Sequence, residues 1–464
     1  MALVLGVDSS TRSTKALLVD ADDGTVVAQS AAPHPPGTEV DPRAWLNAVE
    51  VAANGFRDRA DALAVGGQQH GMVALGEDGE PVRDALLWND TRSAPQAQAL
   101  IEELGGPQAC AEALGSVLVA SFTVTKLRWL RDHEPERAER VAEVLLPHDY
   151  VSRHLSAPGT TAFTDRGDAS GTGYFAIRDG AWRPDLAKAA LGHEPRLPRV
   201  VQPGDIAADT ADGRPVGAGT GDNMAAALGL DLQPGDVLVS IGTSGVASTV
   251  GRQPIADGTG TLTGFADATG GFLPMVTTIN AAGILDLQAD WLGVDHDELA
   301  ALALQSAPGA NGVTVLPYYG GERTPNRPEA AGTWTGLTPR TTRADLARAA
   351  FEALLCSLAD AVDALLTATG DEPRRILLVG GATRSPAVRA LAPAILGRPV
   401  VLPPTGEYVA RGAARQAAWA RSGAPTPPEW PLPDTETLEA DPTPAVRERY
   451  AVLRDHPAPP TTER

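Results

Sequence analysis

Two turns rich in hydroxyl side chains are the first candidates for chemistry in the chain. Residues 8–15 read Asp-Ser-Ser-Thr-Arg-Ser-Thr-Lys, which brings hydroxyls, two cations and a run of backbone N–H groups together. Such a turn can surround phosphate oxygens, because hydroxyls and amides donate hydrogen bonds and cations neutralise charge. Asp8 adds the hard oxygen that a water-coordinated Mg²⁺ needs. An ordinary polar hairpin is the competing interpretation.

The second turn, Gly242-Thr243-Ser244-Gly245, has a similar composition and also follows an apolar run. Two such turns in matching positions suit a polyphosphate that is held between two domains. The pair therefore favours phosphate binding over two unrelated hairpins.

Asp222 is the candidate general base. It follows the glycine-rich stretch Gly217–Gly221, where another backbone or a ligand can approach closely. A carboxylate there can accept the proton of a hydroxyl that attacks a phosphoryl group in line. The alternative is an aspartate that caps a helix over residues 224–230, and one aspartate can do both.

Three further stretches carry groups that suit ligand recognition. Gln68-Gln69-His70-Gly71 and Trp88-Asn89-Asp90 offer paired donors and acceptors with an aromatic face, as a polyol requires, although His70 could equally be a structural histidine. Gly380–Ser385 could admit an adenine and its ribose against bare backbone, or it could be a turn into a helix opened by Ser385-Pro386.

The elements that position these residues follow from short apolar runs and helical repeats. Strands are expected at residues 3–7, 16–19 and 25–27, joined as a meander. A helix is expected from Trp45 to Phe56, with Asp41 as its cap and Pro42 just inside, followed by a strand at 63–65 that ends at Gly66-Gly67.

The second half of the chain repeats this order. It has strands at 237–241 and 246–250 around the second turn, a long helix at 346–369, and a strand at 376–379 that ends at Gly380-Gly381. The repeat predicts two related α/β domains that face each other across a cleft. Residues 422–433 are typical of a linker, residues 442–455 of a last helix, and residues 457–464 of a frayed end.

Composition excludes several classes of protein. With 38 Lys and Arg against 58 Asp and Glu, the net charge of −20 argues against a general nucleic-acid or anionic-membrane surface. The lysines are few, and no G-x-x-x-x-G-K-[S/T] phosphate loop exists, so nucleotide chemistry must use another cradle.

Two features bear on the compartment. Cys110 and Cys356 are too far apart in the sequence for a C-x-x-C pair, which excludes a disulfide framework and a cysteine-based zinc module. The first residues read as a strand rather than a signal peptide, and no apolar stretch reaches the ~18 residues of a membrane span. We therefore expect a cytoplasmic protein.

Taken in order and at their separations, these motifs resemble those of the FGGY family of carbohydrate kinases, and within it the bacterial D-xylulose kinases. The resemblance covers residues 3–420. The stretches that carry it are Gly6–Lys15, Gln69–Gly71, Leu87–Asp90, Phe122–Thr123 with Lys126–Leu127, Leu146–Tyr150, Asp165–Thr172, Gly219–Asn223, Ile241–Gly245, Leu316–Tyr318, Gly321–Pro325 and Gly380–Ala382.

The resemblance implies an α/β fold of two duplicated actin-like (ribonuclease H-like) domains that close on sugar and ATP across a catalytic cleft. It implies Asp222 as catalytic base and Asp8 as the acid near Mg²⁺ and the γ-phosphate. The expected ATP-binding residues are Thr11, Arg12, Ser13, Lys15, Gly242, Thr243, Gly380, Gly381 and Ser385. The expected substrate-binding residues are Gln69, His70, Trp88, Asn89, Asp222 and Asn223.

The chain departs from the family pattern at three places. Gln69 stands where the xylulose enzymes carry a methionine, Gly380–Ala382 shortens a glycine run, and Ser385 replaces an asparagine. The first departure bears on the pocket around one sugar carbon, and the other two bear on the adenine contacts.

The predicted reaction is the ATP-dependent phosphorylation of D-xylulose to D-xylulose 5-phosphate. The alternatives are a kinase of another ketose, polyol or sugar acid in the same family, a non-metabolic actin-like ATPase, and a sugar-responsive transcription regulator. We expect domains at 1–225 and 226–430, with linker, last helix and tail at 431–464. The expected partners are the sugar and ATP, with no nucleic acid and no membrane, and a homodimer is left open.

Overall fold

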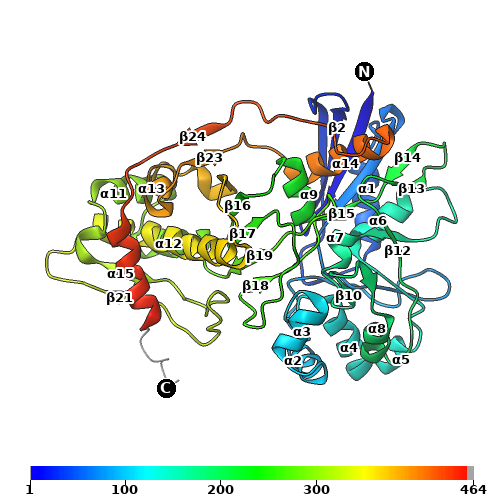
Figure 1. Ribbon diagram of the computed structural model, residues 1–464, viewed down its shortest axis with the longest axis horizontal. Coiled ribbons are helices and arrows are strands. Elements are labelled where there is room, and N and C mark those ends of the chain that lie inside the picture. Colours follow the sequence, from blue (N-terminus) through cyan, green and yellow to red (C-terminus); the bar gives the residue numbers. More distant parts are fainter. Residues whose placement is uncertain (1, 457–464) are drawn as a thin grey trace. The chain divides into compact units, whose positions relative to one another are not determined.

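Three antiparallel strands open the chain in the computed structural model, which describes residues 2–456 (Figure 1). β1 (Leu3–Ser9) pairs with β2 (Ser13–Asp20), and β2 pairs with β3 (Val26–Pro33), so the predicted meander is confirmed. β5 (Ala62–Gly67) then runs parallel to β1, and β15 (Thr220–Gly221) runs parallel to the end of β5. The sheet order is β13-β14-β5-β1-β2-β3, with β13 at Ile206–Asp209 and β14 at Pro215–Gly217.

The chain divides into two compact units, each built from separate segments. The first holds the described residues up to Leu232 together with Gly251–Leu273 and Gly406–Pro431. Its helices are α1 (Arg43–Ala52), α2 (Ala94–Glu103), α3 (Pro107–Leu114), α4 (Thr123–His133), α5 (Pro135–Ala138), α6 (Pro147–Leu155), α7 (Arg166–Ala169), α8 (Pro184–Leu191), α9 (Asp222–Gly229) and α14 (Tyr408–Ser422). Its shorter strands are β4 (Glu39–Val40), β6 (Val73–Leu75), β7 (Ala85–Leu86), β8 (Glu143–Leu145), β9 (Phe163–Asp165), β10 (Phe175–Ala176), β11 (Ala181–Trp182), β12 (Arg199–Val201) and β18 (Leu262–Thr263).

Alternating side chains of β1 enter two different cores. Leu5 and Val7 face a cluster with α1 and α6 that includes Trp45, whereas Val4 faces a cluster with Ala410 and Ala414 of α14. This alternation is the period of two that a strand buried on both faces requires. Helices therefore pack on both faces of this sheet and hold its strands in place.

Helix α14, which lies far along the chain from β1, packs on one face of the first sheet. α14, orange in Figure 1, lies against the blue strands, and Gly6 permits its close approach. The proline-rich stretch 422–433, predicted as a linker, is anchored by Trp430, which is fully buried and donates a hydrogen bond from Nε1 to the Ala21 carbonyl (3.1 Å).

The second unit repeats the strand plan of the first. It holds Gln233–Val250, Pro274–Thr405 and the described residues from Leu432, with sheet order β19-β17-β16-β22-β23-β24. β16 pairs with β17 antiparallel and with β22 parallel, as β1 does with β2 and β5, so the predicted duplication is confirmed. The strands are β16 (Asp236–Ile241), β17 (Gly245–Thr249), β19 (Met275–Thr278), β20 (Thr314–Leu316), β21 (Thr333–Thr335), β22 (Arg375–Val379), β23 (Val400–Leu402) and β24 (Glu436–Leu438), and the helices are α10 (Ala282–Leu292), α11 (His296–Gln305), α12 (Arg343–Thr369), α13 (Pro386–Leu396) and α15 (Pro444–Asp455).

Several predicted boundaries shift. α1 begins at Arg43, after Pro42, and the Asp41 carboxylate accepts the Arg43 N–H (3.0 Å) without forming the cap of the helix. Gly66 and Gly67 belong to β5 instead of ending it, because their backbones pair with β1 and β15. The last helix is confirmed as α15, and the expected frayed end at 457–464 lies outside the described residues.

The residues that make up the two compact units are not those of the expected domains 1–225, 226–430 and 431–464. Those domains are continuous segments, whereas the segment 406–431 packs with the first unit although it follows β23 of the second. The chain therefore passes between the units more than once.

The contact between β1 and α14 generates a stability prediction. A Cβ added at Gly6 would lie 1.9 Å from the Ala410 carbonyl oxygen, so Gly6→Ala forces the helix away from the sheet. We expect the free energy of unfolding to fall by about 1–3 kcal/mol or more, as for other overpacked cores. Urea denaturation measures this change.

Gly406→Ala is the matched control, because its Cβ would meet its nearest neighbour at an ordinary 3.7 Å in the same unit. We expect a change within about 0.5 kcal/mol there. Equal stability of the two variants would contradict the close packing of α14 on β1.

Candidate functional site in two half-sites

The ends of three neighbouring strands bring the first half-site together. In the register of the sheet, Asp8 lies opposite Gly66, and Thr220 lies on the other side of Gly66. The chain leaves β5 into Gln68-Gln69-His70 and leaves β15 into Asp222-Asn223. Because parallel strands end at the same edge of a sheet, residues from three distant parts of the sequence meet there.

Asp222 is the first residue of α9, and its carboxylate is only partly exposed. Burial, together with the negative charges of Asp8 and Asp168, raises its pKa to about 7, although hydrogen bonds from backbone N–H groups act to lower it. Its Oδ1 accepts the Asn223 N–H (2.8 Å) and the Asn223 Nδ2 (3.0 Å). The second predicted role, helix capping, is met in part, because the carboxylate binds the first turn while Gly221 occupies the cap position.

Gln69 and Asn223 form an amide pair beside the Asp222 carboxylate. The Asn223 Nδ2 donates to the Gln69 Oε1 (2.9 Å), which fixes the orientation of both amides. Gln69 is buried, and its Nε2 has no hydrogen-bond partner within the protein. A buried donor without a partner is costly, so Nε2 is poised to bind a ligand oxygen.

His70 is held from two sides. Its Nδ1 lies 2.6 Å from the Gly171 carbonyl oxygen and donates to it, which directs the acceptor of the neutral ring to Nε2. The rings of Phe122 and Phe265 lie 5.0 Å and 5.9 Å from it. His70 also adopts a left-handed backbone (φ 67°), a strained conformation for a residue other than glycine.

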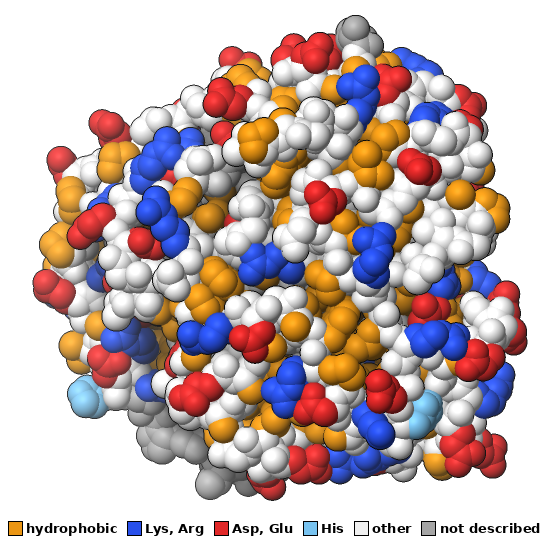
Figure 2. Space-filling view, turned by 45° about the vertical axis from the view of Figure 1, so that its right-hand side comes forward, with side chains coloured by type: hydrophobic (Ala, Val, Ile, Leu, Met, Phe, Trp, Pro, Cys, Tyr) orange, Lys and Arg blue, Asp and Glu red, His pale blue; other side chains and the backbone are white. Residues whose placement is uncertain are grey.

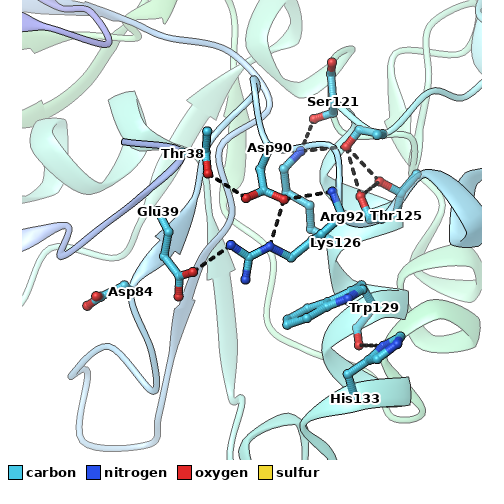
Figure 3. Close-up of polar contacts among 12 residues, drawn as sticks. Thr38, Glu39, Asp84, Asp90, Arg92, Ser121, Thr125, Lys126, Trp129 and His133 are labelled. Atoms are coloured by element: carbon cyan, nitrogen blue, oxygen red, sulfur yellow. Dashed lines mark hydrogen bonds and ion pairs between the residues drawn. The ribbon is translucent and has the colours of Figure 1, made fainter. Parts of the chain in front are cut away.

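The stretch Trp88-Asn89-Asp90 divides between surface and interior. Trp88 is 43% exposed and donates from Nε1 to the Thr11 hydroxyl (2.8 Å), which links the predicted sugar-binding stretch to the first phosphate turn. Asn89 is exposed. Asp90 is buried and accepts hydrogen bonds from Thr38 and Arg92, so its role is structural (Figure 3).

A fully buried lysine supports the wall behind His70. Lys126 of α4 donates from Nζ to the carbonyl oxygens of Ala120 (3.0 Å) and Ser121, and burial lowers its pKa to about 7 (Figure 3). These bonds fix the chain just before Phe122, the residue that packs on His70.

The first hydroxyl turn places a carboxylate and a cation side by side. Asp8 is buried on β1 and accepts the Ser10 hydroxyl (2.5 Å). Lys15 lies on β2 opposite Asp8 rather than in the turn, with its Nζ 3.8 Å from Asp8 and 2.6 Å from Glu407. Burial raises the pKa of Asp8 to about 6, although Ser10 and Lys15 lower it.

The remaining predicted residues of this turn face outward to different degrees. Thr11 and Ser13 are half-buried, and Arg12 is exposed. Arg12 is thus the cation of this turn most accessible to a ligand. On the face drawn in Figure 2, Lys and Arg side chains are interspersed with Asp, Glu and hydrophobic ones.

Sequence reasoning assigned no role to several residues of this half-site. Phe265 and Glu407 lie far along the chain from His70 and Lys15, and no local pattern points to them. His148, Asp165 and Asp168 lie in stretches that carried the resemblance, and the structure brings all three into one buried cluster next to Asp222.

The second half-site is a cavity of about 410 Å³ within the second unit. The turn from β16 to β17 and the turn after β22 form one side of it, and α10, α11 and α12 contribute the rest. Its lining residues are Ile241, Gly242, Thr243, Ala282, Leu285, Asp286, His296, Asp297, Phe351, Gly381, Ala382, Arg384 and Ser385. Four residues predicted to bind ATP, namely Gly242, Thr243, Gly381 and Ser385, are therefore gathered at one cavity.

Gly380, the fifth predicted ATP-binding residue of this unit, has a packing role. A Cβ there would lie 2.5 Å from the Ile241 carbonyl oxygen, and its φ of 100° suits glycine. The adjacent Gly381 faces open space, since its nearest neighbour would be 3.9 Å from a Cβ. The Ser385 Oγ is buried without a hydrogen-bond partner in the protein, which leaves a polar group available at the cavity.

The sites in the two units differ in their chemistry. The first provides a carboxylate whose pKa lies near neutrality, amide and imidazole groups for hydroxyls, and a hydroxyl-rich turn with a buried acid. The second provides a partly apolar cavity with glycine-rich backbone.

Among the described residues, no helix is long and apolar enough to cross a membrane.

Known proteins are similar to this chain over most of its length. The N-terminal domain of the FGGY family of carbohydrate kinases matches residues 3–229, and its C-terminal domain matches residues 237–421. The xylulose kinase of Streptomyces coelicolor is 48% identical over 91% of this chain and 88% of its own length, and that of Streptomyces rubiginosus is 46% identical over the same shares. The crystal structure of xylulose kinase from Bifidobacterium adolescentis aligns with a TM-score of 0.91 and 47% identity, covering 98% of this chain and 99% of the other. Matches that span both units show that the chain belongs to the FGGY family of carbohydrate kinases.

Proposed function

We propose that the chain transfers the γ-phosphoryl group of ATP to D-xylulose and releases ADP and D-xylulose 5-phosphate. The observation that carries the proposal is the grouping of the Asp222 carboxylate with Gln69, Asn223 and His70 at one strand edge. The xylulose kinases that share close to half of its residues support the choice of sugar.

Asp222 supplies the chemical step in this proposal. A primary hydroxyl is a weak nucleophile, and a carboxylate within hydrogen-bond reach accepts its proton as the bond to phosphorus forms. Asn223 and Gln69 orient the remaining hydroxyls, and the Nε2 of His70 accepts a hydrogen bond from a further hydroxyl. The aromatic rings around His70 cover C–H bonds and exclude water that would otherwise hydrolyse ATP.

Asp8 fits the predicted magnesium site. Its carboxylate is buried and its pKa is raised, so a cation nearby would stabilise the ionised form, and oxygen ligands suit Mg²⁺. When bound, Mg²⁺ neutralises charge on the phosphate oxygens. Thr11, Ser13 and the exposed Arg12 then donate to the phosphates, while Lys15 holds Asp8 in place.

The cavity of the second unit is the proposed nucleoside site. Gly242 and Thr243 receive phosphate oxygens, and Gly381 presents bare backbone to the adenosine. Gly380 keeps the two turns in contact, which places Ser385 and its unpartnered hydroxyl at the cavity.

Gln69 bears on the choice between sugars. It stands where the xylulose enzymes carry a methionine, so its Nε2 offers this pocket an additional hydrogen-bond donor near one sugar carbon. Another ketose, a polyol or a sugar acid is therefore the second candidate acceptor. A non-metabolic actin-like ATPase is disfavoured, because such a protein has no need of the buried amide pair. The cytoplasm stays the predicted compartment, and the question of a homodimer stays open.

A substrate panel with a base variant tests the reaction. We expect ADP release to depend on D-xylulose and to exceed that with other pentuloses, hexuloses, polyols and sugar acids. Asp222→Asn removes the proton acceptor at constant size, so kcat falls by about 100-fold or more while ATP binding stays intact. A coupled ADP assay and calorimetric ATP binding measure both.

Asp205→Asn is the control, because Asp205 is an exposed aspartate of the same unit. It should keep wild-type kcat. ADP release that no sugar stimulates, or near-normal turnover in Asp222→Asn, would overturn the proposed function.

The raised pKa of Asp222 predicts the pH dependence of turnover. The carboxyl is protonated below about pH 7 in the ligand-free chain, and a protonated base accepts no proton, so kcat/KM for the sugar decreases as the pH falls. A cation that neutralises Asp8 lowers this pKa, which moves the decline below pH 7 without changing its sign. Rates from pH 5 to 8.5 measure it, and a flat profile down to pH 5 would contradict the assignment.

The cavity around Gly381 predicts a selective effect on the nucleotide. Gly381→Leu places a side chain in space that is open in the wild type, so we expect KM for ATP to rise about tenfold or more with sugar affinity unchanged. Gly381→Ala is the matched control with a small effect. If Gly381→Leu weakened sugar binding and left KM for ATP unchanged, the nucleotide would bind elsewhere.

A further inference from the structure

The short helix α7 is connected to the base through one buried aspartate. Asp165 caps α7, accepting the N–H of Gly167 (2.8 Å) and of Asp168 (2.8 Å). Its Oδ2 also accepts the hydroxyl of Thr220 (2.7 Å), two residues before Asp222. Asp165 and Thr220 are fully buried, so this bond is shielded from water.

A second aspartate of α7 reaches the sugar-binding side. Asp168 accepts a hydrogen bond from the His148 Nδ1 (2.6 Å), and its carbonyl accepts the Gly171 N–H (2.9 Å). The Gly171 carbonyl in turn accepts the bond from the His70 Nδ1 (2.6 Å). One short segment thus contacts the strand end that carries the base and the histidine that faces the sugar.

His148 fills the space beneath both strand ends. A Cβ at Gly67 would lie 2.8 Å from the His148 Cβ, and a Cβ at Gly219 would lie 2.6 Å from its Cδ2. Burial acts to lower the pKa of His148, but the charges of Asp149 and Asp168 raise it to about 9. The ring atom that faces both carboxylates therefore carries a proton, which neutralises part of the charge that a cation would otherwise have to balance.

We propose that α7 is a positioning element for phosphoryl transfer, in which Asp165 places Asp222 through Thr220 and Asp168 places His70 through Gly171. The proposal rests on the proposed function, because it needs Asp222 as base and His70 as sugar ligand. Neither aspartate touches the reacting atoms. Their removal therefore changes geometry at the base or at the sugar contact, and leaves ATP binding untouched.

Thr220 provides the sharpest test, because two substitutions separate its hydroxyl from its bulk. Thr220→Val keeps the shape and deletes the bond to Asp165, whereas Thr220→Ser keeps the hydroxyl. We expect kcat to fall at least tenfold in Thr220→Val, with KM for ATP unchanged, and to recover to within about threefold of wild type in Thr220→Ser. Thr210→Val, which deletes a hydroxyl bonded to Asp212 in the same unit, should keep wild-type kcat.

Asp168→Asn tests the second connection, from Asp168 to His70, and it still tests the proposal if Thr220→Val fails to fold. It removes the charged acceptor of the His148 bond that holds the Asp168 side chain, and so loosens the Asp168 carbonyl that binds Gly171. We therefore expect calorimetric binding of D-xylulose to weaken at least fivefold, whereas Thr220→Val, where folded, binds the sugar as the wild type does. Equal kcat in Thr220→Val and wild type, equal loss in Thr220→Val and Thr220→Ser, or unchanged sugar binding in Asp168→Asn would overturn the positioning role.

The two proposals fail in distinguishable ways. If the wild type prefers another sugar of the panel, the same variants are measured with that sugar, and only the identity of the substrate is revised. If the wild type is active and Thr220→Val has the same kcat, or Asp168→Asn binds the sugar equally well, only the positioning role is overturned. If the wild type phosphorylates no sugar, both proposals are overturned.

Discussion

Negative charge held away from water is the constraint on which the first half-site depends. Burial raises the pKa of Asp8, Asp165, Asp168 and Asp222, and the negative charge of Asp168 also acts to raise the pKa values of Asp165 and Asp222. Buried carboxylates need compensating partners, and the fold supplies them unequally. Asp165 and Asp168 receive backbone N–H groups, a hydroxyl and an imidazolium, whereas Asp222 receives two hydrogen bonds from a single neighbour. Lys15 or His148 lowers the pKa of the other three acids, whereas only hydrogen bonds from backbone N–H groups lower that of Asp222, which is therefore the acid best suited to take up a proton.

Small residues at the strand ends make this arrangement possible. Gly67 leaves room for the Cβ and backbone of His148, Gly219 leaves room for its ring, and Gly221 leaves room for the Gln69 side chain. A side chain at any of these positions would separate the imidazolium from the strands and move Asp222 relative to the amide pair. The glycines at these strand ends thus allow the charged side chains and the backbone to pack closely together.

Local patterns in the sequence were enough for the strand meander, the duplicated plan and the hydroxyl turns, because each depends on neighbouring residues. Asp222 and His70 could be singled out because glycine or amide residues adjoin them. The support around them could not be found this way. Glu407 reaches Lys15, and Phe265 reaches His70, only because the chain returns to the first unit after long excursions. The same return explains why continuous domain boundaries do not follow the compact units. For Lys126, its place in a family motif was the only sign in the sequence, and that sign did not indicate burial.

The two units show how one strand plan can serve two kinds of chemistry. In the first, β1 carries an acid near its end, and the glycines of β5 lead into amide and imidazole side chains. In the second, the corresponding β16 ends in Ile241, and the glycines after β22 lead into an open cavity. The shared hydroxyl turn after β1 and β16 suits phosphate in both, because backbone N–H groups and hydroxyls bind anions whatever surrounds them. What differs is the residue placed beside that turn, since a buried carboxylate lies near the end of β1 whereas the apolar Ile241 ends β16.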